Sequence, residues 1–179
     1  MNPRTGAAHG KINLDRHAVI ALGANLGDPA ATVQAAFASL RSLSAASVLT
    51  SSLWRSEPVD CPPGSPPFIN AIAAVVPHTG ETPESLLRHL QALERAAGRR
   101  PKIVMNEARP LDLDLIAFRR ETRKTPVLTL PHPRAHQRAF VLAPLVELAP
   151  ELVIPGRQET VVALLGGLPA AVRAGISRL

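Results

Sequence analysis

The chain alternates between short apolar runs and segments with helical periodicity. Residues 17–23 form an apolar run that ends in glycine, which is typical of a buried strand. From residue 33 to residue 43, apolar side chains recur three or four positions apart, as along one face of an amphipathic helix. Asp28 and Pro29 stand where such a helix takes its N-cap and its first residue. The pattern therefore predicts a strand followed by a helix.

The same reading extends over the rest of the chain. A loop at 57–67, which holds five prolines and a glycine, is too irregular for a helix or strand. The other predicted elements are strands at 47–56, 68–77 and 111–118, a helix from Thr82 to Gly98, a proline-punctuated segment at 130–152 that ends in a short helix, and an interrupted helical tail at 160–179.

The order strand, helix, strand, strand, helix, strand predicts an α+β fold. Two consecutive strands imply an antiparallel pair, as in the ferredoxin-like split βαβ sandwich. We therefore expect an antiparallel sheet with helices on one face, followed by a C-terminal extension. Residues 1–16 are polar and turn-rich and are predicted to be a flexible leader, with 17–179 as a single domain.

The amino-acid composition limits the classes of protein to which the chain can belong. The 179 residues are 46% apolar, which argues against a disordered chain. The net charge of +6 suits an anionic ligand, such as a nucleic acid, a nucleotide or another polyphosphate, or a merely basic surface. Cys61 is the only cysteine, so an intrachain disulfide and a cysteine zinc cluster are excluded. No run approaches about 18 apolar residues and no signal-peptide pattern is present, so no membrane partner is expected and the expected location is the cytoplasm.

Two aspartates interrupt the strand predicted at 111–118. Side chains alternate across a strand, so Asp112 and Asp114 share one face while the leucines between them point into the core. Their Cα atoms are then about 7 Å apart, and two carboxylates this close need arginines or metal ions between them. Mg²⁺ often binds through one or two carboxylates together with substrate phosphates. The alternative is an ordinary polar sheet face.

Basic side chains on both sides of the acidic strand favour a metal–polyphosphate site, because guanidinium groups bind phosphate oxygens in a fork. These residues are Arg99, Arg100, Lys102 and Arg109 upstream, and His132, Arg134, His136 and Arg138 downstream. Other sites are discounted. "GANLGD" lacks the ending of a P-loop, no nucleophile elbow is present, and Pro133 interrupts the zinc-like spacing of His132 and His136.

Five motifs in order resemble the 6-hydroxymethyl-7,8-dihydropterin pyrophosphokinase family of folate biosynthesis. They are "IALGANLGD", "LWRSEPVD…PFINAIAAV", "LQALERAAGR", "RPLDLDLIAF" and "LTLPHPRAHQRAFVLAPLVELAPEL". Each is modestly specific, but the ordered set from about Val19 to Leu152 is highly specific. The resemblance implies a ferredoxin-like fold and the transfer of pyrophosphate from ATP to the pterin hydroxymethyl group, which releases AMP.

The resemblance also implies roles for individual residues. Asp112 and Asp114 match the acids that hold two Mg²⁺ ions on the triphosphate, and Arg99 and Arg109 match arginines that engage the phosphates. Further ATP contacts are implied at Gln91, Glu94, Leu115, Thr129, His132 and Arg138. The pterin pocket is implied at Ser56, Val59, Phe68, Asn70 and Phe140, with the two phenylalanines on either side of the flat ring. The expected partners are these two small molecules, with no nucleic acid, and the expected state is a monomer.

One loop departs from the family pattern. The common Arg-Trp-Gly-Pro-Arg before the acidic strand is "MNEAR" here, so Asn106 stands in place of the tryptophan. The metal acids and the two main arginines are retained.

Two alternatives stay open. An RNA-binding ferredoxin-like module would suit a basic surface, but aromatics are only 3% of the chain and the aspartates would oppose RNA on the sheet face. A folate-pathway protein that has lost activity is the second alternative, against which the intact aspartate pair argues.

Overall fold

The computed structural model describes residues 11–59, 61–100 and 108–179. Its centre is an antiparallel sheet in the order β5-β1-β4-β3-β8, with β2 also paired to β4. A separate two-stranded sheet pairs β6 with β7. The strands are β1 (Ala18–Ala24), β2 (Leu49–Thr50), β3 (Trp54–Ser56), β4 (Phe68–Val75), β5 (Asp112–Phe118), β6 (Arg123–Lys124), β7 (Thr129–Leu130) and β8 (Ile176–Arg178).

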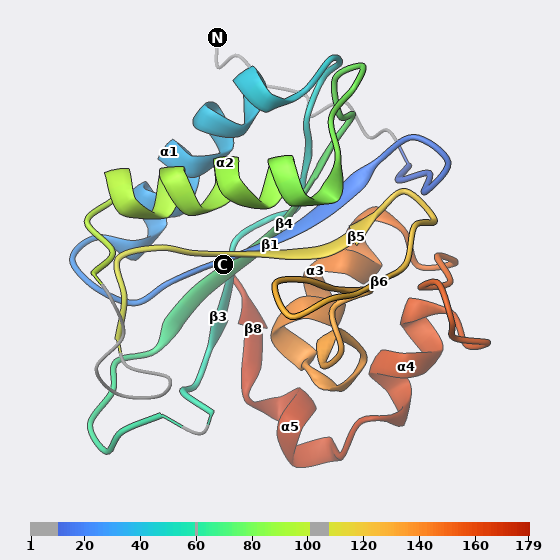
Figure 1. Ribbon diagram of the computed structural model, residues 1–179. Coiled ribbons are helices and arrows are strands. Elements are labelled where there is room, and N and C mark those ends of the chain that lie inside the picture. The colour runs from blue at the N-terminus through green and yellow to red at the C-terminus, as the bar shows by residue number, and fades with distance from the viewer. Residues whose placement is uncertain (1–10, 60, 101–107) are drawn as a thin grey trace, which may run out of the picture.

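Helices cover both faces of the main sheet, with α1 and α2 on one side and α3 and α4 on the other (Figure 1). The helices are α1 (Pro29–Leu40), α2 (Pro83–Ala96), α3 (Ala139–Leu148), α4 (Val161–Gly167) and α5 (Ala170–Ala174), with short 3-10 turns η1 (Arg41–Leu43) and η2 (Ala135–Gln137). In the described part of the chain, no helix combines the length and apolar character needed to cross a bilayer.

Both predicted helix starts are confirmed by their caps. The Asp28 carboxylate accepts a hydrogen bond from the backbone N–H of Ala31 at 3.0 Å, and Pro29 follows as the first helical residue. At α2, Thr82 and Ser85 cap each other's backbone N–H groups, and Pro83 opens the helix. These side chains satisfy backbone donors that the first helical turn leaves without partners.

The alternation predicted for the acidic strand is confirmed. Leu113 and Leu115 are buried in the core under α1 and α2, whereas Ile116 belongs to the core under α3. The central strand β4 is buried along most of its length because it lies between the two layers. The split βαβ order is therefore as predicted, with an antiparallel sheet.

Four details differ from the sequence prediction. The helices of the C-terminal extension cover the second face of the sheet, so the sandwich has three layers rather than helices on one face only. Ile12 and Leu14 are buried in the core under α3, so packing begins inside the segment predicted as a leader; its first ten residues lie outside the described part. The strand predicted at 47–56 is split into β2 and β3, and the tail predicted as helical ends in β8.

Candidate active site

A glycine separates a polar residue of β4 from an aspartate of β5 across the sheet. Gly23 of β1 pairs with Asn70 on one side and with Asp112 on the other. All three face α3, because the residues on either side of Gly23 are buried in the opposite core. A Cβ atom on Gly23 would lie 3.4 Å from Asn70 Oδ1 and 3.9 Å from Phe68 Cδ1. Adjacent strands are roughly 5 Å apart, so Asn70 and Asp112 lie on the order of 10 Å apart with only glycine between them.

Each aspartate of β5 has its own pair of basic side chains nearby. Arg99 donates to Asp112 Oδ1 at 2.6 Å, and Arg109 donates to Asp112 Oδ2 at 3.0 Å. Asp114 Oδ2 lies 3.6 Å from Arg138 Nη1 and 3.9 Å from His132 Nε2. The structure thus brings the two acids together with four of the bases predicted from sequence, which come from the end of α2, the start of β5 and the segment that leads into α3. Lys102 lies outside the described residues.

The balance of charge around Asp114 leaves room for a cation. Burial raises the pKa of its carboxyl, and the negative charge of Asp112 raises it further, although Arg138 and His132 oppose the shift. Burial lowers the pKa of His132, which favours the neutral imidazole. The Asp114 side chain remains 38% exposed, so an ion can reach its oxygens.

The donor chemistry of the pair fits a hard divalent cation. Asp112 and Asp114 offer only oxygen ligands, as Mg²⁺ prefers. No cluster of three or more acidic, histidine or cysteine side chains able to hold a metal occurs within the described ranges. A metal here would therefore complete its coordination with water and with oxygens of a bound ligand, as Mg²⁺ commonly does.

The side chain of Arg109 also indicates an anionic ligand. Its Nε atom is buried and has no hydrogen-bond partner among the residues that the structure describes. A buried guanidinium donor is ordinarily satisfied, and a phosphate oxygen is a suitable acceptor for it.

Two predicted ATP contacts are not oriented as expected. Glu94 is only 7% exposed; it accepts a hydrogen bond from the backbone N–H of Leu113 at 2.8 Å and forms an ion pair with Arg99. Burial raises the pKa of its carboxyl. Glu94 therefore anchors α2 to β5, whereas Gln91 is exposed. The Leu115 side chain lies in the core under α1 and α2, so it faces away from the acids. Thr129 is exposed on β7.

The predicted pterin residues fall into a buried group and an open group. Asn70 and Ser56 are buried, and Asn70 Nδ2 donates to Ser56 Oγ at 2.8 Å. This bond orients Asn70 so that its Oδ1 atom is the one beside Gly23. Phe68 is half-buried on the same strand, whereas Val59 is 60% exposed in the proline-rich loop.

Phe140 connects the aromatic and acidic parts of the site. It lies in the first turn of α3, and the Arg138 guanidinium is 5.4 Å from its ring centroid. A guanidinium at this distance interacts with the electron-rich face of the ring. Arg138 therefore contacts both Phe140 and Asp114.

Asn25 was not predicted as a site residue, yet it joins two parts of the site. It is 4% exposed, and its Oδ1 accepts from the Arg109 backbone N–H at 2.8 Å, while its Nδ2 donates to the Pro66 carbonyl at 3.2 Å. Asn25 thus ties the proline-rich loop to the residue before the acidic strand. Its position directly after a buried strand, in "ALGAN", was the available signal.

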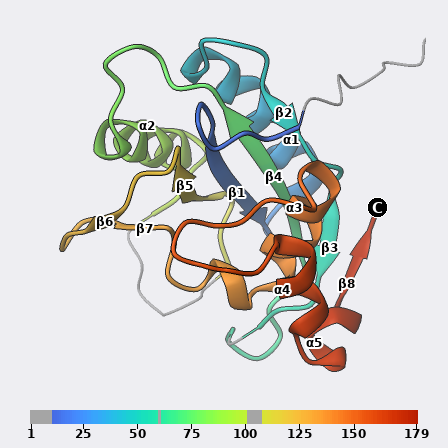
Figure 2. The same cartoon turned by 90° about the vertical axis from the view of Figure 1, so that its right-hand side faces the viewer.

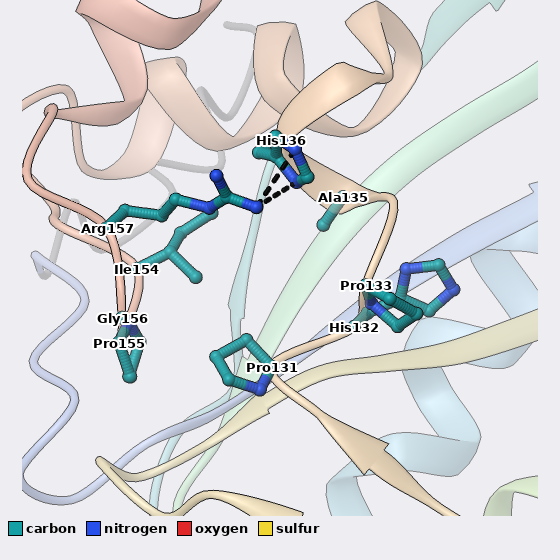
Figure 3. Close-up of a pocket in the computed structure, with 9 residues that line it drawn as sticks. All are labelled: Pro131, His132, Pro133, Ala135, His136, Ile154, Pro155, Gly156 and Arg157. Atoms are coloured by element: carbon teal, nitrogen blue, oxygen red, sulfur yellow. Dashed lines mark hydrogen bonds between the residues drawn. The ribbon is translucent and has the colours of Figure 1, made fainter. Parts of the chain in front are cut away.

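The two histidines with zinc-like spacing belong to different surroundings. His132 lies near Asp114, whereas His136 is within 3.0 Å of the Arg157 guanidinium. Figure 3 shows the two rings apart, at the edge of a small cavity of about 130 Å³. They do not share a metal site. The substituted loop residue Asn106 lies outside the described residues.

Comparison with known proteins shows which protein family the sequence matches. Residues 19–150 match the model of 7,8-dihydro-6-hydroxymethylpterin-pyrophosphokinase (HPPK). The 2-amino-4-hydroxy-6-hydroxymethyldihydropteridine pyrophosphokinase of Haemophilus influenzae is 39% identical over 142 residues, which are 79% of this chain and 86% of the relative. That of Pseudomonas aeruginosa is also 39% identical, over 76% of this chain and 82% of the relative.

Solved structures show the same fold. A structure of Plasmodium falciparum HPPK-DHPS with pterin and p-hydroxybenzoate aligns over 95% of this chain with a TM-score of 0.69 and 13% identity. The chain spans about half the length of that protein, 48% of it. These matches support the predicted ferredoxin-like α+β fold, and the comparisons give no support to an RNA-binding module.

Proposed function

The chain belongs to the 7,8-dihydro-6-hydroxymethylpterin-pyrophosphokinase family, and from this membership we propose its reaction and its site. The enzyme transfers the β,γ-pyrophosphoryl group of ATP to the hydroxymethyl group of 6-hydroxymethyl-7,8-dihydropterin. The products are the pterin diphosphate and AMP, in a step of tetrahydrofolate biosynthesis.

The observation that carries this assignment is the row Asn70–Gly23–Asp112 across the sheet. A pterin held at Asn70 and a triphosphate held at Asp112 would meet over a residue without a side chain. Positioning of this kind can supply a large part of the acceleration, because it makes a reaction between two substrates effectively unimolecular.

In the proposed pterin pocket, Asn70 offers its Oδ1 atom to the donor groups of the pterin edge. Ser56 holds Asn70 in that orientation through the 2.8 Å hydrogen bond. Phe68 and Phe140 supply apolar faces for the flat ring, and Val59 closes over it from the loop. The mixture of apolar walls and a few fixed polar groups is typical of small-molecule sites.

In the proposed ATP site, basic side chains bind the phosphates. Arg99 and Arg109 present forked donors from one side, and Arg138 presents its fork from the other side together with the His132 ring. Gln91 and Thr129 remain proposed contacts for the nucleotide because the side chains of both are exposed. The side chains of Glu94 and Leu115 are buried, so neither is proposed to contact the ligand directly.

We infer that two Mg²⁺ ions bind at Asp112 and Asp114. Ions held there would supply positive charge that neutralises and orients the triphosphate. The pterin hydroxyl oxygen forms a bond to the β-phosphorus and loses its proton, while the bond from that phosphorus to the α,β-bridging oxygen breaks. AMP keeps this oxygen, and Arg99, Arg109 and Arg138 offset the charge that develops on the phosphates.

A monomer is the proposed state in solution. The sheet edge at β5 is covered, because Glu94 accepts from the Leu113 N–H and the Ile116 carbonyl accepts from His132. The opposite edge, β8, is only three residues long. Covered and short edge strands resist pairing between chains. Light scattering on a sizing column tests this state.

One assay tests the reaction. Purified protein is incubated with ATP, Mg²⁺ and 6-hydroxymethyl-7,8-dihydropterin, and AMP and the pterin diphosphate are measured. We expect equal amounts of both, and no AMP when the pterin is omitted. Formation of ADP alone, or AMP that does not depend on the pterin, would contradict the proposal.

A further inference from the structure

The last strand of the chain is attached to the strand that carries Ser56. β8 pairs antiparallel with β3, so that Ile176 is opposite Ser56 and Arg178 is opposite Trp54. Figure 2 shows β8 beside β3 at the edge of the sheet, with the C-terminus at its end. The family model ends at residue 150, so β8 lies outside the matched region.

A carboxylate of α3 fixes this edge from the other side. Glu147 Oε1 accepts from Ser52 N at 3.1 Å and from Ser52 Oγ at 2.9 Å, and Glu147 Oε2 accepts from Trp54 Nε1 at 3.2 Å. Arg178 lies 3.5 Å from the same carboxylate and donates to Ser52 Oγ at 2.7 Å. Glu147, Ser52, Trp54 and Arg178 thus form one connected cluster, which we call the edge cluster. It joins α3, β3 and β8.

The edge cluster is next to the proposed pterin pocket. Ser56 is the last residue of β3, and its hydroxyl is the acceptor that orients Asn70. Directly after it, the backbone N–H of Glu57 donates to the Gly175 carbonyl at 3.0 Å, so the first residue of the proline-rich loop is bonded to the C-terminal segment. β8 therefore holds both Ser56 and the stem of the loop that contains Val59.

We propose that β8 is a positioning element for the pterin: it keeps Ser56 and the stem of the 57–67 loop in the geometry that Asn70 and the pterin need, and Arg178 and Glu147 fasten it. This inference rests on the proposed function, because it names the same pterin pocket. It assigns no contact with ATP to β8, since the ATP residues lie across the sheet on β5 and the segment before α3. Loss of β8 should therefore weaken pterin binding selectively.

The hydrogen-bond pattern between β3 and β8 indicates which backbone N–H group a substitution should remove to test this proposal. Two hydrogen bonds flank its middle pair: Glu57 N to Gly175 O and Leu179 N to Leu53 O, each 3.0 Å. Hydrogen-bonded pairs alternate with non-bonded pairs along an antiparallel ladder. The middle pair, Arg55 and Ser177, is therefore hydrogen-bonded, and the Ser177 N–H points toward β3. Proline at position 177 removes this donor, whereas alanine retains it.

The experiment compares Ser177→Pro with Ser177→Ala in the full chain. We expect Ser177→Pro to raise KM for the pterin about fivefold or more, with KM for ATP changed less than about twofold, because only the pterin side of the site depends on β3. The fluorescence of Trp54, the only tryptophan, should shift to longer wavelength as its environment becomes more hydrated. Ser177→Ala should resemble the unmodified enzyme in both measurements.

A second pair of variants keeps the test decisive if Ser177→Pro fails to fold. Arg178→Ala removes a side chain of the edge cluster, and Arg173→Ala removes an exposed arginine whose side chain donates to the Leu168 carbonyl. The first should raise KM for the pterin and the second should not, and Arg178→Lys should recover part of the loss. Equal pterin KM values in both variants, or equal rises for pterin and ATP, would overturn the inference. An unmodified enzyme without pterin-dependent AMP would instead refute the proposed function.

Discussion

Arg99 Nη1 lies 2.6 Å from Asp112 Oδ1, so an arginine just beyond α2 reaches the acid that begins β5. The same guanidinium forms an ion pair with the buried Glu94, which in turn accepts the Leu113 N–H. Arg99 therefore neutralises two carboxylates in this structure. We propose that it would exchange Asp112 for a phosphate when a metal binds the acid. This double role makes Arg99 a sensitive point of the site.

Replacing Arg99 is expected to lower kcat/KM strongly. A hydrogen bond to a charged group contributes roughly 1.5–3 kcal/mol, which corresponds to a loss of about tenfold to a few hundredfold. Arg99→Lys should recover only part of this loss, because lysine lacks the planar fork. Steady-state rates of AMP formation measure the effect. Arg95→Ala is the control, since Arg95 is exposed near the end of the same helix. A change of less than about threefold in Arg99→Ala would remove Arg99 from the phosphate site.

Substitutions at Gly23 test whether the two proposed substrates need the open space above this residue. Alanine there would place its Cβ 3.4 Å from Asn70 Oδ1, an ordinary contact, so Gly23→Ala should fold and lose a moderate part of the activity. Gly23→Val adds two methyl groups over the same point. It should lower kcat/KM about 100-fold, since a displacement of about 1 Å can have an effect of that size.

A glycine-to-alanine change elsewhere controls for a general effect of added side chains. A Cβ on Gly166 of α4 would meet nothing within 4 Å, so Gly166→Ala should leave kcat/KM unchanged. If Gly23→Val also retained near-normal activity, the substrates could not meet above β1.

The features that sequence predicted well are local ones. The alternation of leucine with Asp112 and Asp114 determines which face each side chain takes, whatever the rest of the fold. The caps at Asp28 and Thr82 likewise act within one turn of their helices. The acids, the arginines and Asn70 could be predicted as site residues for the same reason: each belongs to a short local motif.

The features that were missed depend on the tertiary structure. β8 is a three-residue strand without its own hydrophobic period, and only pairing with β3 makes it a strand. The family resemblance implies an ATP contact for Glu94, yet Glu94 continues the four-residue spacing of Leu86 and Leu90 into the core. A carboxylate at a core position is tolerated only with partners such as Arg99, which sequence spacing could not supply.

Asn25 allows the link between the proline-rich loop and Arg109 to be tested. Asn25→Ala removes the acceptor of the buried Arg109 N–H, so it should lower the free energy of unfolding by about 1–3 kcal/mol. Asn25→Asp keeps that acceptor but loses the donor to the Pro66 carbonyl. It should therefore retain more stability than Asn25→Ala while raising KM for the pterin. Urea unfolding and initial rates measure the two effects, and identical behaviour of the two variants would show that the acceptor for the Arg109 N–H contributes nothing beyond the Pro66 contact, which both variants lose.

His17 predicts how stability depends on pH. Its ring is 7% exposed, and its Nδ1 lies 3.0 Å from the backbone nitrogen of Asn13, at the turn that brings Ile12 and Leu14 to the core. Burial lowers the pKa of His17, which is opposed by its hydrogen bond to the Asn13 backbone and reinforced by the positive charge of Arg16. The folded state therefore favours the neutral imidazole, whereas an unfolded histidine takes up a proton with a pKa of about 6.5.

Stability should consequently fall as the pH drops below about 6.5, because the unfolded state then binds more protons than the folded state, and the loss should level off below the lowered pKa. The free energy of unfolding in urea, measured between about pH 8 and about pH 5, tests this. In His17→Gln the decline in stability should be smaller than in the unmodified chain, because one of the groups that causes it is removed. Some decline should remain, because His132 and His136, whose pKa values are also lowered, still contribute. His78→Gln, at an exposed site, should leave the slope unchanged. If His17→Gln and His78→Gln gave the same slope as the unmodified chain, His17 would not anchor the segment that packs Ile12 and Leu14.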